Sequence, residues 1–255
     1  MNIRVVFNQK GGVGKSTIST NLAAASAKKG LKTLLVDLDA QCNSTHYAGI
    51  DHHDEIKTVA DMFKQTVGWF STQSTAMDFV QPTAFDNLFV MPADPALGKI
   101  ERELESRYKM YKLRETLQEV ASDFDRIYID TPPNFNFYSK AALISATSFL
   151  IPFDCDDFSA QAIEKLLDNV AELRNDHNPE LAFEGIIINQ FNAQANLPKQ
   201  LVQGLKDKGF PVMPTHLSAS VKIRESHSKR TPIVYLSPKH KLSEQFEHLL
   251  SDLEK

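Results

Sequence analysis

The sequence has few cysteines and no long apolar stretch. Only two cysteines, Cys42 and Cys155, occur in 255 residues, and they form no C-x-x-C pair. This usage argues against a disulfide framework or a zinc site. No apolar run approaches the roughly 18 residues that a membrane-spanning helix needs. The N-terminal residues MNIRVVFNQK lack the basic region and cleavage site of a signal peptide. We therefore expect a cytoplasmic globular protein.

The charge is slightly negative overall but unevenly spread. A net charge of −4 at pH 7 gives no sign of a nucleic-acid binder by itself. Residues 199–241, however, carry nine Lys and Arg against two acids, a local charge of +7 that leaves −11 for the rest of the chain. Such an asymmetry is typical of an anion-binding surface.

Short β-branched runs alternate with amphipathic stretches along the whole chain. Most runs are apolar throughout, as expected of strands that helices cover on both faces. The alternation predicts one α/β domain over residues 1–255, a doubly wound and mostly parallel sheet flanked by helices. Residues 67–85 are the least regular and are expected to form a surface loop. The predicted strands are 3–8, 32–39, 87–92, 126–133, 148–154 and 184–191, and the predicted helices are 16–29, 56–66, 95–122, 137–146, 158–174, 195–208 and 239–254.

The stretch NQKGGVGKSTIS, residues 8–19, has most features of a phosphate-binding loop. It departs from G-x-x-x-x-G-K-[ST] because Gln9 and then Lys10 stand where the pattern begins. A strand precedes the loop and an Ala-rich helix follows, so backbone N–H groups at the helix start can cradle phosphate oxygens. We predict that Lys15 reaches the β- and γ-phosphates and that the Ser16 hydroxyl binds Mg²⁺. The predicted nucleotide-binding residues of this loop are Lys10, Gly11, Gly12, Val13, Gly14, Lys15, Ser16 and Thr17.

Acidic residues follow two of the predicted strands. Asp130 ends the apolar strand RIYID, and doubly wound sheets gather their ligands at this carboxyl edge. We expect Asp130 to hold Mg²⁺ through water. The segment LLVDLDA brings Asp37 and Asp39 to the same edge, on one face unless the strand ends between them. One of the two could instead cap the next turn.

Three motifs together resemble the deviant Walker A, Walker A′ and Walker B motifs of the ParA/MinD family of P-loop ATPases. They are KGGVGKST at 10–17, VDLDAQCNST at 36–45 and YIDTPP at 128–133. The resemblance implies a Mg²⁺-dependent ATPase that forms a homodimer when ATP is bound. It also implies that Lys10 is the signature lysine, which crosses the dimer interface to the partner's phosphates. A cation delivered in this way makes hydrolysis depend on assembly, as an arginine finger does.

The resemblance assigns roles to further residues. Asp39 would orient the attacking water, and Asp37 would lie near the metal and the signature lysine. Partition members usually read D-x-D-P-Q-G-N, whereas Ala40 and Cys42 stand here, and neither change removes a catalytic group. The expected catalytic residues are Lys10, Lys15 and Asp39, and the expected Mg²⁺ ligands are Ser16, Asp37 and Asp130.

Asn189 is the candidate for base recognition. It ends the strand GIIIN and matches a family position that hydrogen-bonds adenine, although a strand-end Asn is also a common turn residue. No N-K-x-D follows the Walker B motif, which by resemblance favours ATP over GTP.

Two branches of the family fit the sequence poorly. A membrane-binding branch needs a basic amphipathic C-terminal helix. The C-terminal stretch here is acidic on its polar side, so we expect a helix packed on the domain and no membrane partner. An iron–sulfur branch needs thiolates at the dimer axis, and neither Cys42 nor Cys155 falls where that branch has its ligands.

The partition branch binds DNA without sequence preference. The segment SVKIRESHSKRTP supplies basic residues that could neutralise phosphates, although a solvated charged loop is the alternative. The predicted DNA-binding residues are Lys222, Arg224, Lys229 and Arg230. Because the first strand begins at Ile3, we expect no N-terminal helix-turn-helix domain.

These patterns favour a small ParA-type ATPase that segregates a plasmid or chromosome. Its expected partners are a second copy of the chain, non-specific nucleoid DNA and a ParB-like or other adaptor that stimulates hydrolysis. One alternative is the same switch with a protein cargo, such as a chemoreceptor array or a microcompartment. Another is a P-loop metabolic enzyme or metal-cluster carrier.

Overall fold

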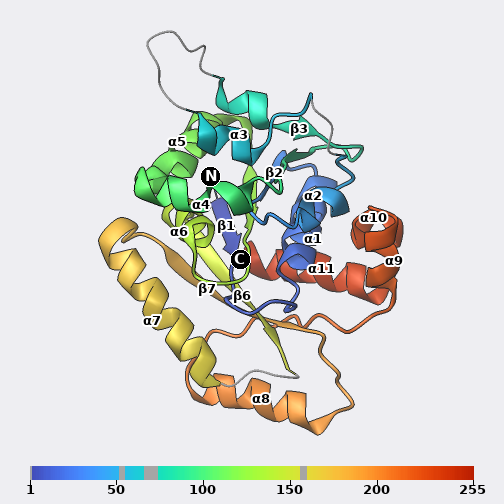
Figure 1. The fold of residues 1–255 in the computed structure, drawn as a ribbon. Coiled ribbons are helices and arrows are strands. Elements are labelled where there is room, and N and C mark those ends of the chain that lie inside the picture. Colours follow the sequence, from blue (N-terminus) through green and yellow to red (C-terminus); the bar gives the residue numbers. More distant parts are fainter. Residues whose placement is uncertain (1, 52–54, 66–73, 156–159) are drawn as a thin grey trace.

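A computed structural model describes residues 2–51, 55–65, 74–155 and 160–255. Their strands form a seven-stranded sheet in the order β3-β4-β2-β5-β1-β6-β7, with helices on both faces (Figure 1). Every pair of neighbours is parallel except β3 and β4. The predicted fold class is confirmed. The strands are β1 (Asn2–Val6), β2 (Thr33–Asp37), β3 (Gln81–Pro82), β4 (Leu88–Met91), β5 (Arg126–Asp130), β6 (Ser148–Asp154) and β7 (Ala182–Asn189).

The helices follow the strands in the alternation that the sequence predicts. Short 3-10 turns labelled η separate some of them. The helices are α1 (Lys15–Lys28), α2 (Asn43–Tyr47), α3 (Val59–Lys64), α4 (Leu97–Ser106), α5 (Lys112–Glu119), α6 (Phe137–Ser145), α7 (Ala160–His177), α8 (Asn196–Asp207), α9 (Lys222–Ser228), α10 (Ile233–Leu236) and α11 (Lys241–Leu253), and the 3-10 turns are η1 (Ala76–Phe79), η2 (Lys109–Tyr111) and η3 (Ala121–Asp123).

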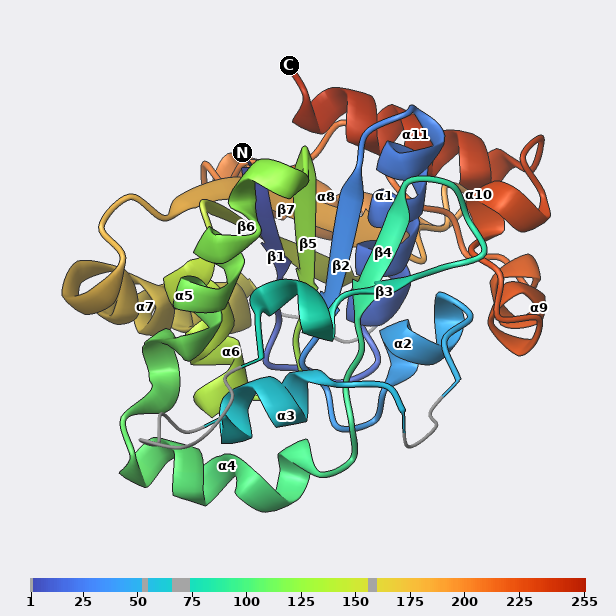
Figure 2. The ribbon, with the colours of Figure 1, turned by 90° about the horizontal axis from the view of Figure 1, so that it is seen from above.

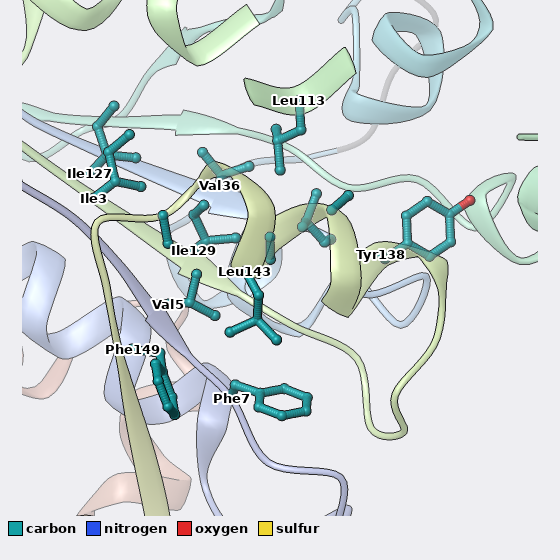
Figure 3. Packing of buried hydrophobic residues seen from close by; sticks show 14 of the residues in the cluster. Ile3, Val5, Phe7, Val36, Leu113, Ile127, Ile129, Tyr138, Leu143 and Phe149 are labelled. Atoms are coloured by element: carbon teal, nitrogen blue, oxygen red, sulfur yellow. The ribbon is translucent and has the colours of Figure 1, made fainter. Parts of the chain in front are cut away.

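Strand alternation divides the core into two layers. Val5, Val36 and Ile129 point to the face that α3 to α7 cover, and Figure 3 shows part of this packing. Val6 and Tyr128 point to the opposite face, where α1, α10 and α11 pack (Figure 2). Because both faces of the inner strands are buried, their sequences are apolar throughout rather than alternating.

Three expectations about local structure need correction. The helix expected at 95–122 is interrupted, since Tyr108 takes a left-handed φ of 54° between α4 and η2. Within the irregular stretch 67–85, the described residues are not a plain loop: η1 buries Ala76 and Phe79, and β3 pairs with β4. The rest of that stretch lies outside the described residues. The short helices α2, α9 and α10 were not expected.

The C-terminal helix α11 packs on the domain, as predicted. Phe246, Leu249 and Leu250 are buried in the same layer as α1. Among the residues that the structure describes, every helix is too short or too polar to span a lipid bilayer.

Arg4 fastens the end of α11 to the sheet. Its guanidinium is only 2% exposed and contacts the Glu184 and Glu254 carboxylates, each at 2.9 Å. It also donates to the Leu253 carbonyl at 2.7 Å. Arg126 from the neighbouring strand pairs with the same Glu254. The acceptors of this buried cation belong to β7 and to the C-terminal end of α11, so Arg4 joins these two elements to β1.

We predict that Arg4→Ala lowers the free energy of unfolding by about 3 kcal/mol, because it removes one partner of a buried ion pair. Urea denaturation followed by circular dichroism measures the loss. The control Lys28→Ala breaks a 2.7 Å ion pair to Glu247 that is about one third exposed on both sides. It should cost less than about 1 kcal/mol. Equal losses in the two variants would contradict this account of Arg4.

Candidate functional site

The phosphate loop joins the carboxyl end of β1 to the start of α1. Gly12 and Gly14 take left-handed backbone conformations, with φ of 78° and 92°. At Gly14 there is also no space, because an added Cβ would lie 2.3 Å from the Asn189 amide nitrogen. Backbone strain and this close contact both exclude a larger residue at position 14.

Two side chains hold this loop in shape. The buried Asn8 accepts a hydrogen bond from the Lys10 N–H at 3.0 Å and donates to the Pro152 carbonyl of β6 at 2.8 Å. The Lys15 ammonium donates to the Lys10 carbonyl at 2.7 Å. Burial lowers the pKa of Lys15, while Asp130 and Asp39 act in the opposite direction. The lysine is thus already inside the loop and beside two carboxylates.

Two pockets meet at the start of α1. One, of about 350 Å³, lies over the loop and includes Lys15, Ser16 and Asp39 in its lining. The other, of about 380 Å³, includes Asn189, Ser218 and Arg224. Both are lined by Gly12, Gly14 and Thr17. Lys15 in the first lining suits an anionic group, and the second pocket is large enough for another part of the same ligand.

Asn189 lies where a base-contacting residue is expected. Its side-chain nitrogen donates to the Val13 carbonyl at 3.0 Å, which ties the end of β7 to the phosphate loop. The residue therefore both supports the loop and lines the second pocket. Its predicted contact with adenine stays a prediction.

Asp130 presents an oxygen that suits a metal ion. One carboxylate oxygen accepts from the Ser44 hydroxyl at 2.7 Å, whereas Oδ1 is buried with no hydrogen-bond partner among the described residues. Burial raises the pKa of Asp130, and the hydroxyls of Ser16 and Ser44 lower it. A carboxylate oxygen beside a serine hydroxyl is the kind of donor set that Mg²⁺ prefers. The residues present therefore fit Mg²⁺ at Ser16 and Asp130.

Asp37 has a different set of contacts. It pairs in register with Asp130 on the adjacent strand, but both of its oxygens already accept hydrogen bonds. They come from the Asp39 N–H at 3.0 Å and from the N–H and hydroxyl of Thr45, both at 2.8 Å. Burial, followed by the charge of Asp130, raises the pKa of Asp37. These contacts shape the turn that carries Asp39, and the expected metal contact of Asp37 stays a prediction.

Asp39 lies in the wall of the phosphate pocket. The strand ends at Asp37, so Asp39 belongs to the following turn, where it accepts from the Gln41 N–H at 3.0 Å. Cys42 in the same turn takes a left-handed φ of 55° and is 2% exposed. Burial, aided by nearby carboxylates, raises the pKa of its thiol to about 12. At neutral pH this cysteine is therefore a thiol, which is a poor metal ligand.

The predicted DNA-binding residues do not form one uniform patch. Lys222 and Lys229 both pair with Glu225, at 2.7 and 2.9 Å. Arg224 is exposed and lines the second pocket. Arg230 is turned toward the 46–51 loop, where it pairs with Asp51 and donates to the Ile50 carbonyl at 2.8 Å. The contacts of Arg230 are those of a residue that fixes a loop.

Three residues of the site were not predicted from the sequence. Asn8 precedes the motif at 10–17, and Ser44 lies inside the motif at 36–45. Both could have been found by asking which neighbouring residues hold the loop and the carboxylate. His227 carries no such signal. It lines the phosphate pocket, and its Nε2 lies 3.0 Å from the Thr17 hydroxyl, 210 residues away in the chain.

Comparison with known proteins gives consistent matches. The family model AAA_31, described as an AAA domain, matches residues 1–183. The sporulation initiation inhibitor protein Soj of Bacillus subtilis is 31% identical over 254 residues, 98% of this chain and 97% of that protein. The chromosome partitioning protein ParA of Myxococcus xanthus is also 31% identical, over 98% of this chain and 87% of its own length.

A solved structure shows the same fold. Cobyrinic acid a,c-diamide synthase from Mycobacterium smegmatis, with a bound ATP analogue and magnesium, superimposes with a TM-score of 0.86. The match covers 100% of this chain and 94% of that chain at 22% identity. Its fold is thus shared with an enzyme whose crystals held a nucleotide and a metal ion.

We predict that Asp130→Asn weakens Mg²⁺ binding beside a nucleotide by about 10-fold or more, because the amide replaces the carboxylate oxygen that suits the metal. Titration of a fluorescent ATP analogue with Mg²⁺ and with a chelator measures the metal-dependent part of the affinity. Asp37→Asn is the matched control. It should chiefly cost stability, about 2 kcal/mol, since Asp37 accepts three hydrogen bonds. The reverse pattern would contradict the distinction drawn between the two carboxylates.

Proposed function

This chain belongs to the ParA/MinD family of P-loop ATPases, and we propose on that premise that it is an ATP-driven partition or positioning switch. The observation that carries the proposal is the pair of pockets at the start of α1. They place Lys15, Ser16 and the Asp39 carboxylate around one end of a nucleotide-sized space. The buried Asp130 carboxylate acts on Lys15 from beneath that end. In this proposal ATP binds there, two subunits associate, and the dimer holds DNA until hydrolysis separates them.

The residues of the loop supply the chemistry of hydrolysis. Lys15 exchanges the Lys10 carbonyl for phosphate oxygens, and backbone N–H groups of the glycine-rich turn donate to the remaining oxygens. Ser16 and Asp130 would hold Mg²⁺, which would supply positive charge that neutralises the phosphates. Asp39 accepts a proton from the attacking water and orients it toward the γ-phosphate. Its position in the pocket wall, beside Lys15, supports that role.

Lys10 is the proposed contact to the second subunit. The residue before Lys10 is also fixed, because the Gln9 carbonyl accepts a hydrogen bond from the Asn134 N–H at 3.0 Å. The backbone at Lys10 is therefore fixed by Asn8 and used by Lys15, which sets the point at which the Lys10 side chain leaves the loop. A cation placed in this way suits the phosphates of a neighbouring subunit.

We predict that Lys10→Ala keeps ATP affinity within about 3-fold but loses at least about 10³-fold in stimulated hydrolysis, the low end of what an arginine finger supplies. Lys15→Ala is the comparison variant and should lose nucleotide binding itself. Fluorescent ATP titration and phosphate release separate the two effects. Stimulated turnover of Lys10→Ala at the wild-type rate would refute the proposed role of Lys10.

The DNA surface in this proposal is the outer side of α9. Lys222 and Lys229 hold the pKa of the exposed Glu225 at about 2 by their hydrogen bonds. Solvent screens exposed ion pairs of this kind, so they are weak and DNA phosphates can compete for both lysines. The exposed Arg224 adds a third cation, and Arg230 is the weakest candidate because it is bound to the 46–51 loop. Nucleoid association follows from such binding.

A DNA titration with ATP, ADP and no nucleotide, at two salt concentrations, tests the proposal. We expect tight binding only with ATP, equal across sequences. The variant Lys222→Ala with Lys229→Ala should flatten the salt slope by about 1 to 2 per subunit. The control Lys99→Ala removes a lysine of α4, on the opposite face of the sheet. If no nucleotide state binds DNA, a protein-cargo switch or a metabolic enzyme is the better reading, and substrate-dependent ATP turnover would favour the enzyme.

A further inference from the structure

His227 lies between the phosphate loop and the basic helix. Its Nε2 is 3.0 Å from the Thr17 hydroxyl on the first turn of α1, and its ring lines the pocket over the loop. The same residue sits in the last turn of α9. We infer that His227 is a positioning residue that couples nucleotide binding at the loop to the basic surface of α9. This inference rests on the proposed function, because it names a regulator of the DNA-binding surface.

Further contacts fix α9 to the nucleotide site. The His227 ring stacks on Tyr47 of α2 with centroids 3.8 Å apart and an interplanar angle of 16°. The buried Tyr47 hydroxyl lies 2.7 Å from the Ser226 hydroxyl and accepts from the Asn21 amide at 3.0 Å. Asn21 belongs to α1. The two consecutive residues Ser226 and His227 therefore join α9 to both α1 and α2, which cluster in space (Figures 1 and 2).

The network is buried and polar, so its geometry is well defined. Asn21 and Ser226 are fully buried, and Tyr47 is 1% exposed. The Ile233 N–H donates to the Tyr47 hydroxyl at 3.2 Å and to the side-chain oxygen of Asn21, Oδ1, at 2.9 Å. These bonds also fix the start of α10. Moving one member of such a network alone leaves buried polar groups without hydrogen-bond partners, which is unfavourable. The network therefore shifts as a unit rather than stretching.

The two sides of α9 connect this network to the surface. Ser226 is buried and His227 contacts Thr17 and Tyr47. Arg224 and Lys229 are exposed and Lys222 is half-buried, and Glu225 pairs with both lysines. The helix has only seven residues. A displacement at His227 is thus carried to the lysines over less than two turns.

Thr17 is placed to sense a ligand, because it lines both pockets at the start of α1. A ligand in either pocket contacts Thr17 or lies beside His227. Burial lowers the pKa of His227, so its ring is neutral at neutral pH and exchanges hydrogen bonds with a hydroxyl rather than attracting phosphate as a cation. This makes His227 a partner of Thr17 rather than a phosphate ligand.

Linkage gives the quantitative test. If ATP raises the affinity for DNA by some factor, DNA must raise the affinity for ATP by the same factor. We expect His227→Ala to reduce both factors by about 5-fold or more, each factor being the ratio of that variant's own affinities with and without the second ligand. His227→Gln places an amide near the position of Nε2 and should retain most of the coupling. His216→Ala is the matched control, because that ring packs on Phe191, away from the loop.

The measurement uses the full chain, a fluorescent ATP analogue and a short duplex of mixed sequence, each titrated with and without the other. Unchanged coupling in His227→Ala overturns the inference. Loss of nucleotide affinity without DNA also overturns it, since His227 would then be a ligand. Thermal melting of each variant shows whether it is folded. If His227→Ala does not fold, the coupling measured in His227→Gln tests the inference instead, because this variant should retain most of it.

A second experiment tests the inference even if the wild-type protein binds no DNA. The absence of DNA binding would reject only the proposed function. Hydrogen exchange of the α9 amides is compared with and without the ATP analogue. The inference expects a nucleotide-dependent change in the wild type and in His216→Ala, and its loss in His227→Ala. If α9 exchange ignores the nucleotide in the wild type, or still responds in His227→Ala, the inference is wrong.

Discussion

The structure depends on how α1 begins. Two glycines with left-handed backbone, Gly12 and Gly14, turn the chain so that the first N–H groups of α1 face a pocket. Asn8 fastens the same turn to β6, and Asn189 of β7 fills the space that a side chain at position 14 would need. Phosphate binding, metal binding and the proposed cation across the dimer all follow from this one turn, because each uses its backbone or its neighbours.

Burying two carboxylates is the main unfavourable contribution of the site to the stability of the fold. Asp37 and Asp130 lie side by side on adjacent strands, and burial raises the pKa of both. Hydrogen bonds from Thr45 and the Asp39 N–H offset the cost at Asp37, whereas Asp130 keeps one oxygen without a partner among the described residues. Such an oxygen suits a cation, so the pair divides into one residue that shapes the turn and one that we propose for the metal.

Much of this fold follows from the sequence. The physical reasons for this also explain which elements and contacts were not predicted. Six strands and the long helices were predicted because burial on both faces makes strands apolar throughout. Helices such as α2 and α9 span two turns or fewer, too short to show a period of 3.6 residues. The phosphate loop was recognised from its motif. The link from Thr17 to His227 and the loop contacts of Arg230 join residues far apart in the chain, and no local pattern encodes them.

In the proposed switch, one subunit completes the site of another only when ATP is present. Sedimentation velocity of an Asp39→Ala variant, in which hydrolysis should be slowed, tests this most directly. With ATP and Mg²⁺ the protein should sediment as a dimer, and with ADP as a monomer. A monomer at saturating ATP, or the same mass in both nucleotides, would contradict the proposed switch.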